Sequence, residues 1–577
     1  MRVALLGAEL EENIGLRYMG SALEARGHAA EIVPFNSGRE EADTVRRTMA
    51  LSPDLIGLSM VFTSRGREFC RLADALRAAG FTGRLIGGGH FAALNAERLL
   101  ADWPAFDAVG LGEGEDIITA LADDPAHPEK VAGLCYRMAD GSIVRNPSRG
   151  NPDNLDALPF PKRTTFHSYF DKPIASILSS RGCWRDCAFC SINAWYKSGG
   201  GKKFRTRGID NIVAEMKDLY FTHGVRIFNF QDDNFFLPEP KLAARRFEAL
   251  RDGLREARVG QIAIAVKARP DSITEESIRV LDELGLFRVF LGVENASERG
   301  LRALNRHCSV EDILKALRIL NNYDVHIAYN LLMWELDTTM EDLLINLRFM
   351  GRHIENPANF CRAEAYEGTG LAAKLRAANR LEGDYFGFDY RLRDPRVEAL
   401  HQMANFAFFD RTFNDDGLHY FNMQVDFMYQ LLRRFHPELV SETLRAEVRN
   451  FIKHTNLDTF TCLARIYDFA VAMDPADTKA MWRFAGEMRE RVDAASDALR
   501  DDGERLLDWM QRLYDERDRP REPEREPARV PYGPTEQPDH QHFPGMGVAE
   551  GGSAIDWLGL GGRPVPYDEF RRRMESR

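Results

Sequence analysis

The chain of 577 residues lacks the features that would place it in a membrane or on nucleic acid. It has no run of about 18 apolar residues, so we expect no membrane span. Its formal net charge is −12 and no stretch forms a basic stripe, which argues against a nucleic-acid partner. The N-terminal MRVALLGAEL is short and acidic residues follow it, which favours a buried first strand over a secretory signal. We therefore expect a cytoplasmic protein.

Cysteine is scarce, with 8 residues in the whole chain. Four of them, Cys70, Cys135, Cys308 and Cys462, lie far apart, and we interpret them as small buried apolar residues. Disulfides are rare in the reducing cytosol, so cysteines that do cluster indicate metal or redox chemistry.

The order of elements predicts several domains in an α/β chain, and a chain of this length suggests about two to four. Residues 1–130 alternate strand and helix patterns, which predicts a doubly wound (Rossmann-like) parallel sheet. Residues 131–172 are rich in Pro, Asn and Asp and are expected to form a linker. Residues 173–368 repeat the alternation six times, which predicts a full or partial β/α barrel with its chemistry at the strand C-termini. Residues 369–515 are predicted to be mainly helical, and residues 516–577 to be a Pro-rich, charged linker and tail.

The strand candidates can be placed individually. Those of the first sheet are 1–7, 29–35, 54–60, 84–89 and 108–114, and those of the barrel are 174–180, 226–231, 261–267, 288–294, 326–334 and 358–366.

Two Gly-rich turns follow strands of the first sheet, GGGH at residues 87–90 and GEGE at residues 112–115. Ligands of doubly wound sheets bind at the strand C-termini, and glycine lets a ligand approach the backbone closely. Tight strand-to-helix turns also use glycine without any ligand, so both interpretations stay open.

Cys183, Cys187 and Cys190 stand in the spacing C-x3-C-x2-C directly after a predicted barrel strand. Three thiolates are one fewer than a structural zinc site or an iron–sulfur cluster usually takes. Zinc with a fourth ligand from elsewhere therefore remains an alternative. An iron–sulfur cluster on three cysteines leaves one iron open to a substrate's donor atoms, and cleavage of S-adenosylmethionine requires such an iron.

This segment, SSRGCWRDCAFCSI, resembles the cysteine motif of the radical-SAM superfamily, including the aromatic Phe189 before the last cysteine. The resemblance covers residues 174–367. It implies a 4Fe–4S cluster on Cys183, Cys187 and Cys190, whose open iron binds the amino and carboxylate groups of S-adenosylmethionine. Reductive cleavage would then yield methionine and a 5′-deoxyadenosyl radical.

Further segments resemble parts of the family pattern. FNFQDDNFF resembles the segment near the methionine amino group, so Asp232 and Asp233 would accept hydrogen bonds from the ammonium; an exposed acidic turn is the alternative. Glu294, at the end of the fourth strand, matches the acidic residue that contacts the ribose hydroxyls. YEGTGL, at residues 366–371, resembles the Pro-Gly-Thr turn and is expected to border the substrate. Residues 330–339 depart from the family's Gly-x-Pro-x-Glu-Thr turn, so no adenine contact is assigned there.

A doubly wound domain before a radical-SAM barrel is similar to the cobalamin-binding class of radical-SAM proteins, and DLIGLSMVFTS, RLIGGGHFAA and VGLGEGE occur in the order expected. Corrinoid methyltransferases often carry Asp-x-His-x-x-Gly, but the matching loop here, GAELEENIGL, has no histidine. We therefore expect base-off cobalamin without that ligand, and we interpret His28 and His90 as structural. The residues expected to line the corrinoid site are Ser59, Thr63, Gly87, Gly88, Gly89, Gly112, Glu113 and Gly114.

The leading hypothesis is a cobalamin-dependent radical-SAM methyltransferase. One S-adenosylmethionine would methylate the cobalt, and a second would be cleaved to a radical that takes hydrogen from an unactivated carbon of a small-molecule substrate. That carbon would then receive the methyl group. A non-methylating rearrangement or cyclisation, and a non-catalytic corrinoid- or metal-binding sensor, are the alternatives. The expected partners are the substrate and an electron donor such as flavodoxin or ferredoxin.

Overall fold

The structure, a computed structural model, describes residues 1–414 and 417–518. These residues form two compact units. Unit 1 comprises residues 1–284, 302–307 and 364–390, and unit 2 comprises residues 285–301, 308–363 and the described residues from 391 to 518. The tail predicted at 516–577 lies outside the described residues from 519 on.

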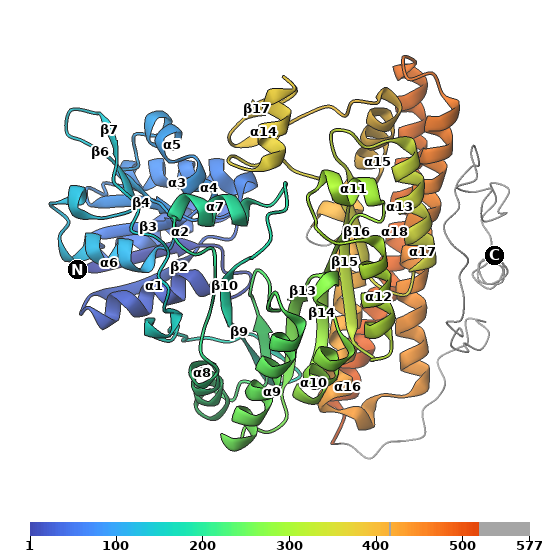
Figure 1. The fold of residues 1–577 in the computed structure, drawn as a ribbon, viewed down its shortest axis with the longest axis horizontal. Helices are drawn as coiled ribbons and strands as arrows, with labels where there is room; N and C mark the ends of the chain where they lie inside the picture. The colour runs from blue at the N-terminus through green and yellow to red at the C-terminus, as the bar shows by residue number, and fades with distance from the viewer. Residues whose placement is uncertain (415–416, 519–577) are drawn as a thin grey trace. The chain divides into compact units, whose positions relative to one another are not determined.

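A seven-stranded sheet forms the N-terminal part of unit 1 (Figure 1). Its order is β2-β1-β3-β4-β5-β6-β7, in which β1 to β5 are parallel and the last two strands are antiparallel. The order reverses between β1 and β3, which is where doubly wound sheets bind ligands. The bounds are β1 Arg2–Gly7, β2 Ala29–Pro34, β3 Leu55–Ser59, β4 Arg84–Gly88, β5 Ala108–Gly110, β6 Leu134–Arg137 and β7 Ile143–Arg145.

Helices cover both faces of this sheet because its strands are apolar on both sides. For example, Leu5 and Leu6, adjacent in β1, are both fully buried, each in a different core cluster. One face packs against α1 (Ile14–Ala25) and α6 (Glu115–Asp123), and the other against α2 (Glu41–Ala50), α3 (Gly66–Ala78), α4 (His90–Leu94) and α5 (Ala96–Asp102).

Three short strands, β6, β7 and β8, lie within residues 131–172, where the sequence predicted a linker, and the first two join the first sheet. Leu134, Cys135 and Tyr136 are buried in the core of the first sheet, so this segment extends the sheet as an antiparallel edge. The strands are short and the residues around them are polar, so the sequence pattern did not indicate them. The domain boundaries themselves stay a prediction.

A second group of strands in unit 1 begins the barrel. The order is β8-β9-β12-β13, with β9, β12 and β13 parallel. Between β9 and β12 the chain forms the hairpin of β10 and β11 and the helix α7, which carries the site described below. The bounds are β8 Ser168–Tyr169, β9 Lys172–Ile177, β10 Ser180–Gly182, α7 Ser191–Gly199, β11 Phe204–Thr206, α8 Ile209–Thr222, β12 Ile227–Phe230, α9 Pro240–Glu256, β13 Ala263–Ala268 and α10 Glu275–Leu284.

Unit 2 carries three further parallel strands in the order β14-β15-β16 and most of the helical C-terminal region. Strands and helices again alternate, so the chain has six β/α repeats and forms a partial barrel. The predicted fold class is thus confirmed. The bounds are β14 Leu286–Glu294, α11 Glu298–Ala303, α12 Val310–Asn321, β15 His326–Trp334, α13 Met340–Arg352, β16 Ala358–Arg362, α15 Pro395–Phe413, α16 Leu418–Phe435, α17 Glu442–Ala472 and α18 Thr478–Asp515; α14 (Gly370–Ala377), β17 (Glu382–Asp384) and β18 (Gly387–Asp389) belong to unit 1.

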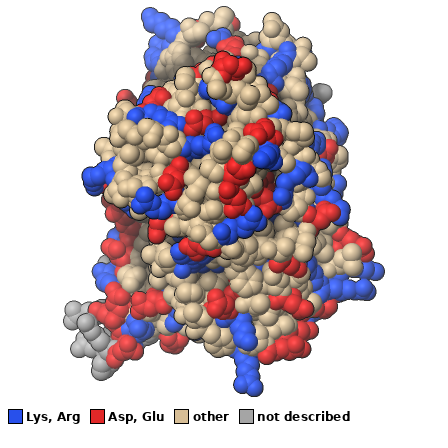
Figure 2. Space-filling view, turned by 90° about the vertical axis from the view of Figure 1, so that its left-hand side faces the viewer, with Lys and Arg blue, Asp and Glu red and all other residues tan. Residues whose placement is uncertain are grey.

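None of the helices in the described ranges is long and apolar enough to cross a membrane. On the face drawn in Figure 2, acidic and basic side chains are interspersed. Of the four scattered cysteines, Cys70, Cys135 and Cys462 are buried as predicted, whereas Cys308 is only half-buried and that prediction is wrong.

Candidate functional site

The three clustered cysteines lie on the loop between β10 and α7, and Cys190 is the N-cap residue of that helix. Cys187 is buried, whereas Cys183 and Cys190 are half-buried. Backbone hydrogen bonds hold the loop from two sides, from Ala188 N to Leu304 O at 2.9 Å and from Leu371 N to Ala188 O at 2.8 Å. The loop is therefore fixed by segments more than a hundred residues away in sequence.

The segment after Leu304 clasps the cysteine loop with an unusual backbone. Asn305 and His307 have φ values of 52° and 51°, in the left-handed region that residues other than glycine rarely adopt. Both contact Asp186, where Asn305 Nδ2 donates to the carbonyl at 2.9 Å and the His307 ring lies 2.9 Å from the carboxylate. Strained backbone of this kind persists where the surrounding structure demands it, often at functional sites.

The donor set fits a cluster ligated by three cysteines. Burial raises the pKa of the Cys190 thiol to about 12 and also raises that of Cys183, so bound metal would have to draw off the protons. Two buried guanidinium groups supply positive charge, because Arg306 Nη1 and Arg269 Nη1 lie 3.2 Å and 3.6 Å from Cys187 Sγ. In the described part of the chain, no three His, Cys, Asp or Glu side chains form a group that could hold a metal ion. A 4Fe–4S cluster binds each thiolate at a separate iron, so its ligands need not converge on one point.

The two aspartates after β12 have different surroundings. Asp232 is fully buried, and its carboxylate accepts hydrogen bonds from Ser179 N at 3.0 Å, Ser179 Oγ at 2.7 Å and Ser180 Oγ at 2.5 Å. Asp233 is half-buried and accepts one bond, from Gly182 N to Oδ2 at 3.0 Å. Burial raises its pKa to about 6. Asp233 therefore faces the cysteine loop, while Asp232 braces the end of β9; a contact of either with an ammonium stays a prediction.

Sequence reasoning missed Asn234, which follows these aspartates. Its side chain is 1% exposed, and within the described residues neither its amide oxygen nor its nitrogen has a hydrogen-bond partner. Ser272 Oγ, after β13, is also buried without a partner. These two groups follow β12 and β13, but other buried polar atoms of the described residues also have no partner. A contact of Asn234 or Ser272 with a polar ligand therefore stays a prediction. The only signal in the sequence was position, directly after the acidic pair.

The remaining residues predicted around the cluster are placed as follows. Phe189 is half-buried in the cysteine loop. The 366–371 turn adjoins that loop, because a Cβ added to Gly370 would lie 3.5 Å from Ala188. Glu294, in unit 2, ends β14 with a φ of 62°, so its backbone is strained at a strand C-terminus. Its contact with a ribose stays a prediction.

The predicted corrinoid-binding residues divide into two groups. Ser59 and Gly88 pair at the C-terminal ends of β3 and β4, next to the β1/β3 reversal, and Thr63 follows in the next turn. A Cβ added to Gly88 would meet no atom within 4 Å, so this position opens onto free space. At Gly87 an added Cβ would instead meet core side chains, and Gly89 (φ 90°) approaches the Met60 carbonyl.

The 112–114 turn has protein neighbours instead. A Cβ on Gly112 would lie 3.3 Å from Gly199 Cα at the end of α7, and one on Gly114 would strike Met19. Glu113 forms ion pairs with Arg205 at 2.5 Å and Arg181 at 3.2 Å. This turn thus fastens the first sheet to the segment around α7, and its contact with a ligand stays a prediction.

Helix α7 joins the cysteine loop to the first sheet, which the sequence did not predict. It lies beside α4 (Figure 1), and Trp195 and Tyr196 belong to the core of the first sheet. Trp195 Nε1 and Asn193 Oδ1 are buried without partners among the described residues. The His90 ring meets Trp195 edge-on at 4.6 Å, and burial lowers its pKa to about 4, so it is neutral near pH 7. Amide side chains of a corrin ring would satisfy such groups, so the residues fit the predicted cofactor.

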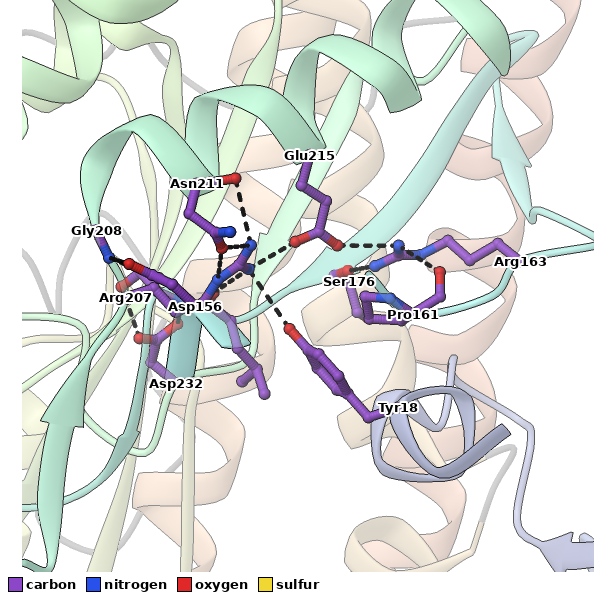
Figure 3. A network of polar contacts seen from close by, with 12 residues as sticks. Tyr18, Asp156, Pro161, Arg163, Ser176, Arg207, Gly208, Asn211, Glu215 and Asp232 are labelled. Carbon is purple, nitrogen blue, oxygen red and sulfur yellow. Dashed lines mark hydrogen bonds and ion pairs between the residues drawn. The ribbon is translucent and has the colours of Figure 1, made fainter. Parts of the chain in front are cut away.

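The loop after β1, which has no histidine, is tied to the barrel strands by charge. The Glu12 carboxylate accepts hydrogen bonds from Arg163 Nε at 2.7 Å and Ser176 N at 2.6 Å. Arg163 also pairs with Glu215 at 3.0 Å, and Glu215 pairs with Arg207 at 2.6 Å (Figure 3). Glu12 is thus engaged by the barrel part of unit 1. His28, for its part, contacts Asp123 at 2.9 Å, which agrees with its structural interpretation.

Comparison with family models gives two matches. Residues 177–344 match the Radical SAM superfamily, and residues 7–122 match the B12 binding domain.

Several curated relatives are similar to this chain. An uncharacterized methyltransferase of Pyrococcus horikoshii is 23% identical over 67% of this chain and 83% of its own length. Cytidylyl-2-hydroxyethylphosphonate methyltransferase of Streptomyces wedmorensis is 25% identical over 50% of this chain and 62% of its own length. An anaerobic magnesium-protoporphyrin IX monomethyl ester cyclase of Synechocystis sp. is 24% identical over 54% of this chain and 62% of its own length. The chain thus spans less than two thirds of the last two relatives.

Two solved structures share the fold. The cobalamin-dependent S-adenosylmethionine radical enzyme OxsB, with aqua-cobalamin and S-adenosylmethionine bound, has a TM-score of 0.66 at 14% identity and covers 89% of this chain and 84% of its own. The radical S-adenosylmethionine methyltransferase TsrM of Kitasatospora setae has a TM-score of 0.55 at 18% identity and covers 66% of this chain and 78% of its own. At these identities the likeness is one of fold.

Proposed function

Because the chain belongs to the radical-SAM enzymes that carry a B12-binding domain, we propose that it is a cobalamin-dependent methyltransferase acting on an unactivated carbon of a small molecule. The two domains imply the cofactors predicted from the sequence, a 4Fe–4S cluster, S-adenosylmethionine and cobalamin. When bound, the cluster supplies the electron that cleaves S-adenosylmethionine to a 5′-deoxyadenosyl radical, and the corrinoid supplies the methyl group.

One observation carries the proposal: a single helix borders both cofactor sites. Cys190, a proposed cluster ligand, caps α7, and Trp195 on the same helix packs into the B12-binding domain. Trp195 lies five positions after Cys190, which corresponds to roughly 7.5 Å along the helix axis. A radical made at the cysteine loop and a methyl donor on the first sheet would therefore be neighbours, as transfer to a short-lived carbon radical demands.

Named side chains would hold each group. Cys183, Cys187 and Cys190 would ligate the cluster, while Asp233 and Asn234 would orient the methionine end of S-adenosylmethionine. Ser59, Thr63 and Gly88 would line the corrinoid site, with Asn193 and Trp195 bonding the corrin's amides. An electron donor of the flavodoxin or ferredoxin class would reduce the cluster, and a cytoplasmic location would suit both that donor and an oxygen-sensitive cluster.

The test is anaerobic turnover with isotopically labelled methyl groups. Reconstituted protein given S-adenosylmethionine with a labelled methyl group and candidate small molecules should form 5′-deoxyadenosine, S-adenosylhomocysteine and a labelled product. Cys187→Ala should lose 5′-deoxyadenosine and product, whereas Cys308→Ala, a half-buried cysteine outside the loop, should retain both. Protein that binds no cobalamin, or a labelled methyl that never reaches a product, would contradict the proposal.

A second candidate is cyclisation or rearrangement without methyl transfer. The relatives that are named cyclases favour keeping it, because they match this chain about as well as the methyltransferases do. The ratio of products separates the two. Methyl transfer forms S-adenosylhomocysteine and 5′-deoxyadenosine together, whereas a rearrangement forms little of the former.

A further inference from the structure

The Cys187 sulfur has two guanidinium groups within hydrogen-bonding distance. Arg306 Nη1 is 3.2 Å away and Arg269 Nη1 is 3.6 Å away, and the two arginines are 4% and 6% exposed.

The two arginines are held in place independently of any cluster. Arg269 follows β13, and its Nε donates to Asp271 Oδ1 at 2.9 Å while its Nη2 donates to the carbonyl of Arg306. Arg306 sits between Asn305 and His307, whose left-handed backbones fix the turn against the cysteine loop. Neither guanidinium has to move to meet the sulfur, so the arrangement is preorganised.

From this geometry we infer that Arg306 and Arg269 are positioning residues that raise the reduction potential of the cluster through the Cys187 thiolate. The inference rests on the proposed function, because it presumes the cluster. Reduction adds one electron, taken from a flavodoxin- or ferredoxin-class donor, and changes no covalent bond. N–H···S bonds and buried positive charge stabilise that more negative state, so they shift the potential upward. The shift would let a weaker reductant start the reaction.

The test measures the potential directly and needs neither substrate nor methyl transfer. Arg306→Gln, Arg306→Lys and Arg269→Gln are reconstituted anaerobically, their iron and sulfide are counted, and the reduced cluster is titrated by electron paramagnetic resonance. We expect a more negative potential than in the parent protein for all three, largest for Arg306→Gln and smaller for Arg306→Lys, which keeps a charge. Arg411→Gln is the matched control, because Arg411 is 4% exposed in unit 2 and bonds Ser496 and Thr459.

Full clusters at the parent potential in the variants would overturn the inference while leaving the proposed function intact. If Arg306→Gln takes up no iron, Arg306→Lys and Arg269→Gln decide by the same measurement. Loss of the cluster from all three, with the control intact, would overturn the redox role and leave the arginines as structural supports. A parent protein that assembles no cluster would instead refute the proposed function.

Discussion

At the scale of single residues, a substitution at Gly88 should weaken cofactor binding without affecting the stability of the fold. Gly88 has free space where a Cβ would stand and no left-handed φ, so Gly88→Ala should leave the free energy of unfolding within about 0.5 kcal/mol of the parent value. The added methyl group would occupy room proposed for cobalamin, and overpacking costs about 1–3 kcal/mol. Cobalamin should therefore bind about five- to a hundredfold more weakly, as measured by absorbance titration.

Gly87→Ala is the matched comparison for that experiment. A Cβ there would lie 3.3 Å from Met60 Sδ and 3.4 Å from Phe106, so this variant should lose stability instead. Parent-like cobalamin affinity in a well-folded Gly88→Ala protein would rule out the end of β4 as the corrinoid site.

Single residues also mark where sequence reasoning stopped. The cysteine spacing was sufficient to find the loop. The sequence could not distinguish the roles of Asp232 and Asp233, because they are adjacent residues of the same type. Their orientations depend on Ser179 and Gly182, which belong to a distant segment. Arg306 lies more than a hundred residues after the cysteines, and nothing local to it predicted a contact with Cys187. Contacts made by tertiary folding have no periodic signal in the sequence.

At the scale of elements, the sequence was more informative. Each strand predicted for the first sheet and for the barrel overlaps an observed strand, because parallel strands covered on both faces form continuous apolar runs. Helix α7 was missed, since it follows directly on the cysteine motif and is only nine residues long. The two cofactor sites were therefore predicted separately, and the helix that joins them came from the structure.

A buried carboxylate on helix α8 is expected to stabilise unit 1. Glu215 is 1% exposed and pairs with both Arg163 and Arg207 (Figure 3). Glu215→Gln therefore removes the carboxylate partner of Arg207 and leaves Arg163 with Glu12 alone. Breaking a buried ion pair typically costs about 3–5 kcal/mol, and we expect a loss of that order in urea unfolding. Lys217→Gln, at an exposed position of the same helix, should change stability by less than about 0.5 kcal/mol. Equal effects of the two variants would show that the network does not stabilise unit 1.

At the scale of the whole molecule, the free energy of unfolding is expected to depend on pH. The reason is that unit 2 contains a buried cluster of ionisable side chains. His326 and Asp426 are 0% and 1% exposed, and their side chains lie 3.2 Å apart. Arg449 pairs with Asp426 at 3.0 Å and with Asp324 at 2.6 Å. Burial would raise the pKa of Asp426, but Arg449 and His326 together hold it below its usual range. Burial, with Arg288 and Arg449 nearby, lowers the pKa of His326 despite Asp426.

Both shifts act in the same direction. The unfolded chain binds a proton at His326 near pH 6.5 and at Asp426 near pH 3.8, and the folded chain binds each only at lower pH. The stability contributed by each group is therefore present above its unfolded pKa and is lost as the pH falls.

The test is a set of urea titrations between pH 7.5 and 5. As the pH is lowered, the free energy of unfolding of unit 2 should decrease less steeply in His326→Gln than in the parent protein. His127→Gln, at an exposed position in unit 1, is the control and should keep the parent slope. Asp426→Asn should cost about 3–5 kcal/mol at pH 7, because it leaves Arg449 with less compensating charge in the interior. A His326→Gln slope equal to that of the parent would mean that His326 is already charged in the folded protein, and the Asp426 contact would then be an ordinary ion pair.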